Sequence, residues 1–272
     1  MTVAEHATPA SPSYGVTLPR VVRSEWTKLR SLRSTVWSLL AALAFILLFA
    51  VLIPSLMVSQ WSQRRPEDIL TFDPTSISLA GAGIGQLAIG VLGVLLISGE
   101  YSTGMIRASL AAVPTRVPIL VAKAIVFSIT VFVTTLPALF AAFFIGQAIF
   151  TSKHAEAQLS DPGVLRVVIG SALYLTAAGL LGLALGALLR HTAGAISLLV
   201  GLLIVLPPLM LLLPADIRHS FNQYTPGHAA DSLISVRRLP HTLAPWTGFG
   251  VFCAYWVVGL VVAAVLLRRR DA

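Results

Sequence analysis

Six long apolar stretches constrain the fold of this chain more than any other feature. They cover residues 35–58, 77–98, 118–149, 164–189, 193–213 and 246–267. A helix needs about 20 apolar residues to cross a bilayer, and each stretch reaches that length. The stretches are continuous, whereas the strands of a membrane β-barrel alternate apolar and polar residues over about 10 positions. The sequence therefore predicts an all-α integral membrane protein with a transmembrane domain of six helices over residues 35–267.

The scarcity of charge excludes other classes of protein. Charged residues make up 11% of the chain, against about 25% in soluble domains. A soluble domain of this length would lack the polar residues needed to cover its surface, which excludes an ordinary cytosolic enzyme and a disordered chain. The single cysteine, Cys253, excludes an intrachain disulfide and hence a disulfide-rich secreted scaffold.

Three segments outside the spans have distinct characters. Residues 1–18 are rich in Pro, Ser, Thr and Ala without apolar periodicity, which predicts a disordered tail and no signal peptide. Residues 19–34 carry five positive charges. The spacing of Val22, Trp26, Leu29 and Arg33 would place these four residues on one face of a helix. This pattern predicts an amphipathic helix in the headgroup layer of the membrane lipid; the alternative is a basic flank of the first span. Residues 268–272 form a basic tail.

The distribution of the +8 net charge predicts the orientation. Six spans place both termini on one side, together with residues 99–117 and the turn at 190–192. With the nearby Lys123 included, that side holds 12 basic and four acidic residues, whereas the other side holds seven of each. The positive-inside rule then predicts cytoplasmic termini. Because the basic residues flank spans and form no separate patch, the sequence predicts no nucleic-acid partner.

Glycine and proline distinguish individual spans. The second span contains Gly81, Gly83 and Gly85, which favours close helix packing through small residues. Pro137 in the third stretch predicts a long helix that is kinked or tilted. Pro207-Pro208 is expected to break the fifth span near its far end. Residues 209–245 should then face outward and partly re-enter the membrane, with Ser232 open to labelling from outside.

The motifs of several enzyme classes are absent. The sequence contains no GxxxxGK[ST] loop, no HExxH and no GxSxG, and its six histidines have no metal-ligand spacing. The spans also lack charged residues at their centres, since Glu100, Lys123 and Arg166 lie near the edges, where long side chains reach water. Proton-coupled carriers keep an ionisable group inside the membrane, so uphill transport by this chain would need energy from another subunit. The uncharged interior favours lipid-like or amphipathic cargo over small ions.

The segment after the second span, residues 99–117, is polar enough to leave the membrane on the side of the termini. Ser102 is a candidate N-cap of a short helix there. The apolar face of that helix would consist of Met105, Ile106, Leu110 and Val113. The alternative is an ordinary cytoplasmic loop.

The order of these features resembles a known family. The run SEWTKLRSLRS precedes the first span, and GEYSTGMIRASLAAVPTR follows the glycine-rich second span; four further spans and a basic tail complete the chain. This arrangement, from about residue 20 to residue 270, is similar to the permease subunits of bacterial ABC transporters of the type-2 exporter class, in particular the short permeases of drug-efflux and bacteriocin self-protection systems. The polar loop 59–76 has no assigned counterpart in that pattern.

The resemblance implies specific partners and coupling residues. Residues 100–110 would form a coupling helix that docks on a separate ABC ATP-binding subunit, with candidate coupling residues Glu100, Tyr101, Thr103 and Arg107. Glu100 and Arg107 are seven residues apart, so on a continuous helix they would share one face. ATP and Mg would bind the partner subunit, and this chain would hold no cofactor or metal and have no catalytic residue. A second permease copy, or a sister permease, would complete a dimer.

The predicted function is therefore that of the permease subunit of an ATP-driven exporter in a bacterial cell membrane. It would form the path for an amphipathic or hydrophobic substrate, such as a drug, a peptide or a lipid-like molecule. Two alternatives remain at this stage. One is a membrane enzyme or accessory membrane protein without transport activity, and the other is a secondary carrier.

Overall fold

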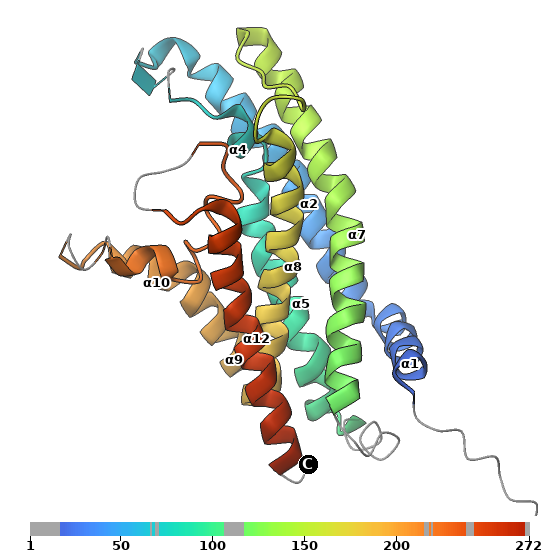
Figure 1. Cartoon of the computed structure of the whole chain (residues 1–272). Coiled ribbons are helices and arrows are strands. Elements are labelled where there is room, and N and C mark those ends of the chain that lie inside the picture. Colours follow the sequence, from blue (N-terminus) through green and yellow to red (C-terminus); the bar gives the residue numbers. More distant parts are fainter. Residues whose placement is uncertain are drawn as a thin grey trace, which may run out of the picture.

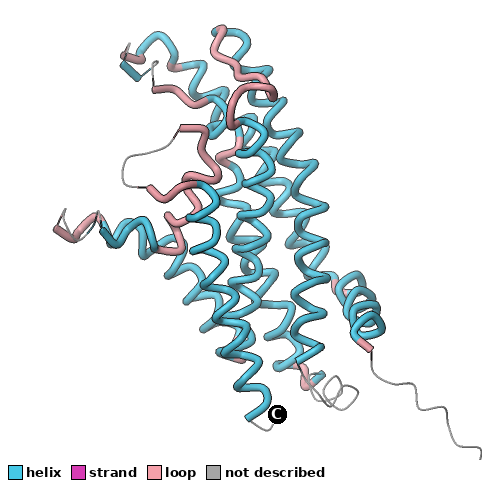
Figure 2. Tube along the Cα trace, viewed as in Figure 1, coloured by secondary structure: helices cyan, strands magenta, loops and turns pink. Residues whose placement is uncertain are grey.

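The computed structural model describes residues 17–65, 67–68, 71–105, 117–214, 218, 220–237 and 242–269. Every regular element in these ranges is a helix (Figures 1 and 2). Six helices are long and apolar enough to cross a membrane, which confirms the predicted all-α membrane fold. The spans are α2 (Arg33–Ser59), α5 (Gly81–Ser102), α7 (Val117–Phe150), α8 (Val164–Leu189), α9 (Thr192–Val200) continued by α10 (Leu206–Met210), and α12 (Pro245–Arg269).

Helix α8 is the centre of the bundle and packs against α5 through glycines on both helices. A Cβ atom on Gly93 of α5 would lie 2.0 Å from the carbonyl oxygen of Gly179, and one on Gly182 would lie 2.1 Å from that of Gly90. The two backbones are therefore in direct contact, as small residues permit in membrane helices. The predicted glycine packing in the second span holds for Gly81, which faces the backbone of α2, but a Cβ on Gly83 would meet no atom within 4 Å.

Helix α1 (Leu18–Ser31) precedes the first span and lies at an angle to the bundle (Figure 1). Its buried residues are Val21, Glu25 and Leu29, so the predicted face through Val22, Trp26, Leu29 and Arg33 is wrong in part. Trp26 is exposed. The buried row contains a carboxylate that an apolar periodicity does not reveal. Extended backbone at Leu32 separates α1 from α2.

The fifth span is irregular before its two prolines. A π-helical turn, Gly201–Val205, joins α9 to α10. Prolines 207 and 208 donate no backbone hydrogen bond, so the regular α-helical pattern of the preceding turn is lost. Beyond the turn, α10 extends away from the bundle axis (Figure 1).

The chain then returns to the bundle between residues 222 and 236, a stretch we call the return segment. Ala229, Ala230 and Leu233 of this segment are fully buried. The expectation that Ser232 is open to labelling is wrong. Ser232 is 3% exposed and its Oγ donates to the carbonyl of Leu243, because the segment packs inward against the helices.

Gly93→Ala should destabilise the protein, because the added methyl group would collide with backbone atoms of α8 that have no room to move. Overpacking of this kind costs about 1–3 kcal/mol. The matched control is Gly83→Ala, on the same helix but facing open space. Thermal unfolding of the detergent-solubilised protein should show a lower Tm for Gly93→Ala alone. Equal Tm values for the two variants would contradict the close contact of α5 and α8.

Candidate functional site

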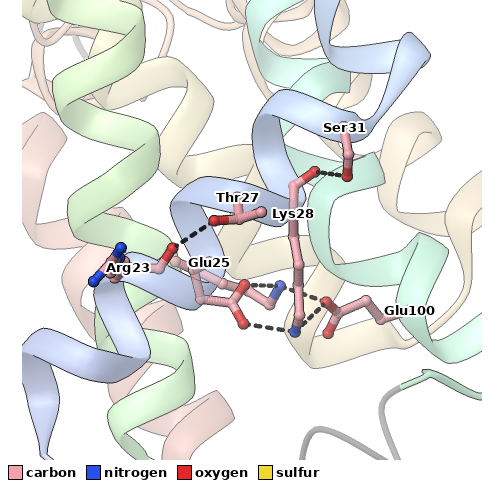
Figure 3. Close-up of polar contacts among 7 residues, drawn as sticks. Arg23, Glu25, Thr27, Lys28, Ser31 and Glu100 are labelled. Atoms are coloured by element: carbon pink, nitrogen blue, oxygen red, sulfur yellow. Dashed lines mark hydrogen bonds and ion pairs between the residues drawn. The ribbon is translucent and has the colours of Figure 1, made fainter.

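Four charged residues meet where α1, α5 and α7 converge, at the end of the bundle that carries the C-terminal end of α12 (Figure 1). We call them the charge cluster: Glu25 and Lys28 from α1, Glu100 from α5 and Lys123 from α7. Lys123 Nζ lies 2.6 Å from Glu25 Oε2 and 2.7 Å from Glu100 Oε1. Lys28 Nζ lies 2.7 Å from Glu25 Oε1 and 3.2 Å from Glu100 Oε1. Figure 3 shows Glu25, Lys28 and Glu100 pointing toward one another.

The arrangement is a closed ring in which each carboxylate contacts both ammonium groups. Its charges sum to zero, and it joins three helices that are distant in sequence. Lys28 and Glu25 are three residues apart on α1 and so share one face of that helix. Glu100 lies in the last turn of α5, and Lys123 lies near the start of α7.

The cluster is buried. The side chain of Lys123 is 1% exposed and that of Glu100 is 7% exposed. The expectation that these two side chains reach water at the membrane edge is therefore wrong. The reason is tertiary: α1 packs across the ends of α5 and α7 and covers them. Buried charges need partners and good geometry to offset their desolvation, and the ring supplies both.

Lys28 is the most exposed member, at 30% of its side chain. Burial lowers its pKa, but the hydrogen bond to Glu25 and the charges of Glu100 and Glu25 outweigh burial, so that the pKa is raised. Lys28 is therefore held in its charged form. Glu100 Oε2 is buried, and no described residue donates a hydrogen bond to it. One acceptor of the ring thus remains open.

Tyr101 connects the charge cluster to the turn between α8 and α9. The guanidinium carbon of Arg190 lies 5.2 Å from the centre of the Tyr101 ring, within the range of a cation–π contact. Arg190 has a positive φ of 53° at the end of α8, and the next residue, His191, accepts a hydrogen bond from Gly194 N to cap α9. The last turns of α5 thus contact α1 and α7 through the charge cluster, the end of α8 through Arg190, and the start of α9 through the hydrogen bond from Thr192 Oγ1 to Ser98 Oγ.

The predicted coupling residues fall in two groups. Glu100 and Tyr101 lie in the last turn of α5, and Thr103 follows it, with its Oγ1 donating to Gly99 O. Arg107 lies outside the described residues. Because α5 ends at Ser102 and Gly104 has a φ of 71°, the helix that holds Glu100 does not continue toward Arg107.

Ser102 is also not the N-cap that the sequence predicted. It is the last residue of α5, and its Oγ donates to Gly99 O. The second span extends past the predicted end at residue 98, since α5 continues through Gly99 and Glu100 to Ser102. Met105, two residues beyond the helix cap, is 46% exposed.

Sequence reasoning missed Glu25 and Lys28 as members of a site. The only available signal was a carboxylate three residues before a lysine on a basic helix, which is common on solvated surfaces. Nothing in the sequence aligns Glu25 with Glu100 or Lys123.

The charge cluster is suited to holding helices together rather than to catalysis. Both ammonium groups are engaged by carboxylates, so it offers no free amine. Within the described ranges, no group of three or more His, Cys, Asp and Glu side chains is placed to hold a metal ion.

The six-span bundle, with an amphipathic helix ahead of its first span, defines a multi-pass α-helical membrane protein. The family model described as ABC-2 family transporter protein matches residues 54–272, which is most of the chain. The chain therefore belongs to the ABC-2 transporter family, as the sequence resemblance predicted. It is a membrane component of an ABC transporter, a kind of transporter that works with an ATP-binding partner. No curated protein matches it significantly.

Lys123→Met should destabilise the protein strongly, because it leaves Glu25 and Glu100 buried beside each other with only Lys28 between them. Removing one partner of a buried ion pair typically costs about 3–5 kcal/mol. The control is Arg65→Met, which breaks the ion pair between Arg65 and Glu67. The side chains of these two residues are 78% and 72% exposed. Chemical or thermal unfolding should separate the two variants clearly. A Tm of Lys123→Met equal to that of the wild type would show that the ring contributes nothing to stability.

Proposed function

We propose that this chain is the permease subunit of an ATP-driven exporter, coupled to a separate ATP-binding subunit that holds ATP and Mg. The observation that carries the proposal is the position of the turn 102–105, which we call the coupling turn. It is exposed at the end of the bundle nearest the charge cluster and follows directly on Glu100. This turn is the surface on which the partner would act.

The charge cluster would transmit a push on the coupling turn to the helices around it. Glu100 lies within three residues of Thr103, and its Oε1 contacts lysines of both α1 and α7. A displacement of the end of α5 therefore displaces α1 and α7 as well, since separating the ions would leave buried charges unpaired. In an allosteric transition of this kind, packed helices move as rigid units.

The remaining parts of the proposal follow from charge and composition. The surplus of basic residues on the side of the termini favours a cytoplasmic location for that side in a bacterial membrane. A second permease copy or a sister permease would complete the translocation path. The apolar spans suit a drug, peptide or lipid-like cargo that is hydrophobic or amphipathic.

Met105→Arg should weaken association with the ATP-binding subunit, because it places a bulky charge on the exposed coupling turn. Disrupting a central interface contact costs about 2 kcal/mol or more, so co-purification should fall at least about tenfold if Met105 lies at the centre of the interface. The control is Ser152→Arg, an exposed residue at the opposite end of α7.

A second variant separates docking from transmission. Glu100→Gln is expected to retain the complex but to lower substrate-stimulated ATP hydrolysis, with Glu67→Gln, an exposed carboxylate, as its control. Tm values would be recorded for both. Unchanged co-purification in Met105→Arg and unchanged stimulation in Glu100→Gln would reduce the coupling turn to an ordinary loop.

A reporter fused after Ala272 should be active only in the cytoplasm. A C-terminal green fluorescent protein should fluoresce, and alkaline phosphatase at the same position should be inactive. The matched control inserts the phosphatase after Ser152, which should make it active outside. Phosphatase activity at the C-terminus would invert the proposed orientation.

A further inference from the structure

A cavity of about 270 Å³ lies at the end of the bundle opposite the charge cluster. Its walls come from α4 (Pro74–Ser78), the first turn of α5, helix α8 and the return segment. The polar side chains in its lining are Ser76, Ser171, Asp231 and Ser235. Leu79 and Ala82 contribute apolar surface. Neither the charge cluster nor the coupling turn contributes to this cavity.

The hydroxyl groups of the cavity have no proton left to donate. Ser76 Oγ donates to Asp73 Oδ2 at 2.6 Å, Ser171 Oγ donates to Val167 O at 2.8 Å, and Ser235 Oγ donates to Asp231 O at 2.8 Å. A serine hydroxyl carries a single proton but two acceptor lone pairs. Each of the three therefore presents only acceptor capacity to a ligand.

The carboxylate of Asp231 adds a further acceptor. No described residue donates a hydrogen bond to it or forms an ion pair with it. The nearby guanidinium of Arg166 is engaged by the carbonyls of Ser232, Leu233 and Ser235. Burial raises the pKa of Asp231 to about 7, which is the expected effect of desolvating a carboxylate without a counter-ion.

We propose that this cavity binds a protonated amine of the transported cargo, with Asp231 as its counter-ion. The inference deepens the proposed function, on which it rests, by naming the cargo as a cationic amphipathic molecule. An alkylammonium group carries only donors and a positive charge, like the lysine ammonium, and it matches a lining that carries only acceptors and a carboxylate. Its carbon substituents would contact Leu79 and Ala82.

The size of the cavity favours an organic cation over a bare metal ion. A water molecule occupies about 30 Å³ in the liquid, so a cavity of about 270 Å³ exceeds the space that a sodium ion requires. One carboxylate and three hydroxyl oxygens also leave its apolar wall unused by such an ion. Sodium is therefore kept as an outcome of the test.

Binding should depend on pH through Asp231. Its carboxyl group is charged above its pKa of about 7 and neutral below it, so affinity for an amine should rise with pH across this value. The other titratable groups on the elements around it are Asp73 at the N-cap of α4, Arg166 and Tyr174 on α8 and His228 in the return segment, and the Arg166 guanidinium is engaged by backbone carbonyls. Burial lowers the pKa of His228, which stays neutral near pH 7.

The experiment uses the purified full chain in lipid nanodiscs, with butylamine as probe and butanol as its neutral match. Binding would be measured by saturation-transfer NMR at about pH 8 and about pH 6, between which an alkylamine, like lysine with its pKa of about 10.4, stays protonated. The wild type should bind butylamine but not butanol, and more weakly at the lower pH. Asp231→Asn should lower the affinity about tenfold or more.

Controls make each outcome decisive. Asp161→Asn, an exposed carboxylate at the same end of the bundle, should bind as the wild type does, and Asp231→Glu should retain binding. Equal binding of butylamine to Asp231→Asn, or displacement of butylamine when potassium chloride is replaced by sodium chloride, would overturn the proposal. If Asp231→Asn fails to fold, the pH dependence of the wild type still decides it. Asp231→Asn should not alter co-purification of the ATP-binding subunit, so failure here is distinct from failure of the transporter assignment.

Discussion

The contact of α5 with α8 is the constraint on which the rest of the structure depends. Gly93 and Gly182 bring the two backbones into contact at the carbonyl groups of Gly179 and Gly90, and a methyl group at either position would collide with the facing backbone. Because α8 is the most enclosed helix of the bundle, this contact fixes α5 along its middle. The two ends of α5 then take different roles. One end carries Glu100 into the charge cluster, and the other lines the cavity that contains Asp231.

Two sites in the described part of this apolar chain hold charged groups largely away from water. They differ in whether partners of opposite charge neutralise those groups. The charge cluster is neutral and closed, with each carboxylate contacting two lysines. Such a ring holds α1, α5 and α7 in one arrangement, because moving them apart would leave buried charges unpaired. Asp231 is partly buried, and no described residue forms an ion pair with it, so its desolvation is not offset by a neighbouring charge of the described chain. This difference in pairing is why the cavity next to Asp231 is proposed as a binding site and the neutral ring as a connection between helices.

The spans were predictable because a continuous apolar stretch of this length has one stable solution in a bilayer. The ends of the spans were less predictable: α5 continues through Gly99 and Glu100, and Glu100 is paired there with Lys28 and Lys123, which are distant in sequence. The candidate site was predicted in part: Glu100 and Tyr101 lie at the expected end of the bundle, but the helical connection from Glu100 toward Arg107 was wrong. The burial of Glu25, Lys123 and Ser232 depends on which segments fold over them. That information is tertiary and has no periodic signal in a single sequence.

The irregular fifth span explains why a cavity exists at the far end of the bundle. The π-helical turn lies just before Pro207 and Pro208, α10 extends away from the bundle axis, and the return segment packs back against the helices. Backbone without regular structure is tolerated inside a membrane protein only where its polar groups find partners. Arg166 supplies donors to three carbonyls of that segment, and Asp73 accepts from Val236 N. These two side chains attach the return segment to α8 and to the start of α4, and Asp231 of the same segment lines the cavity.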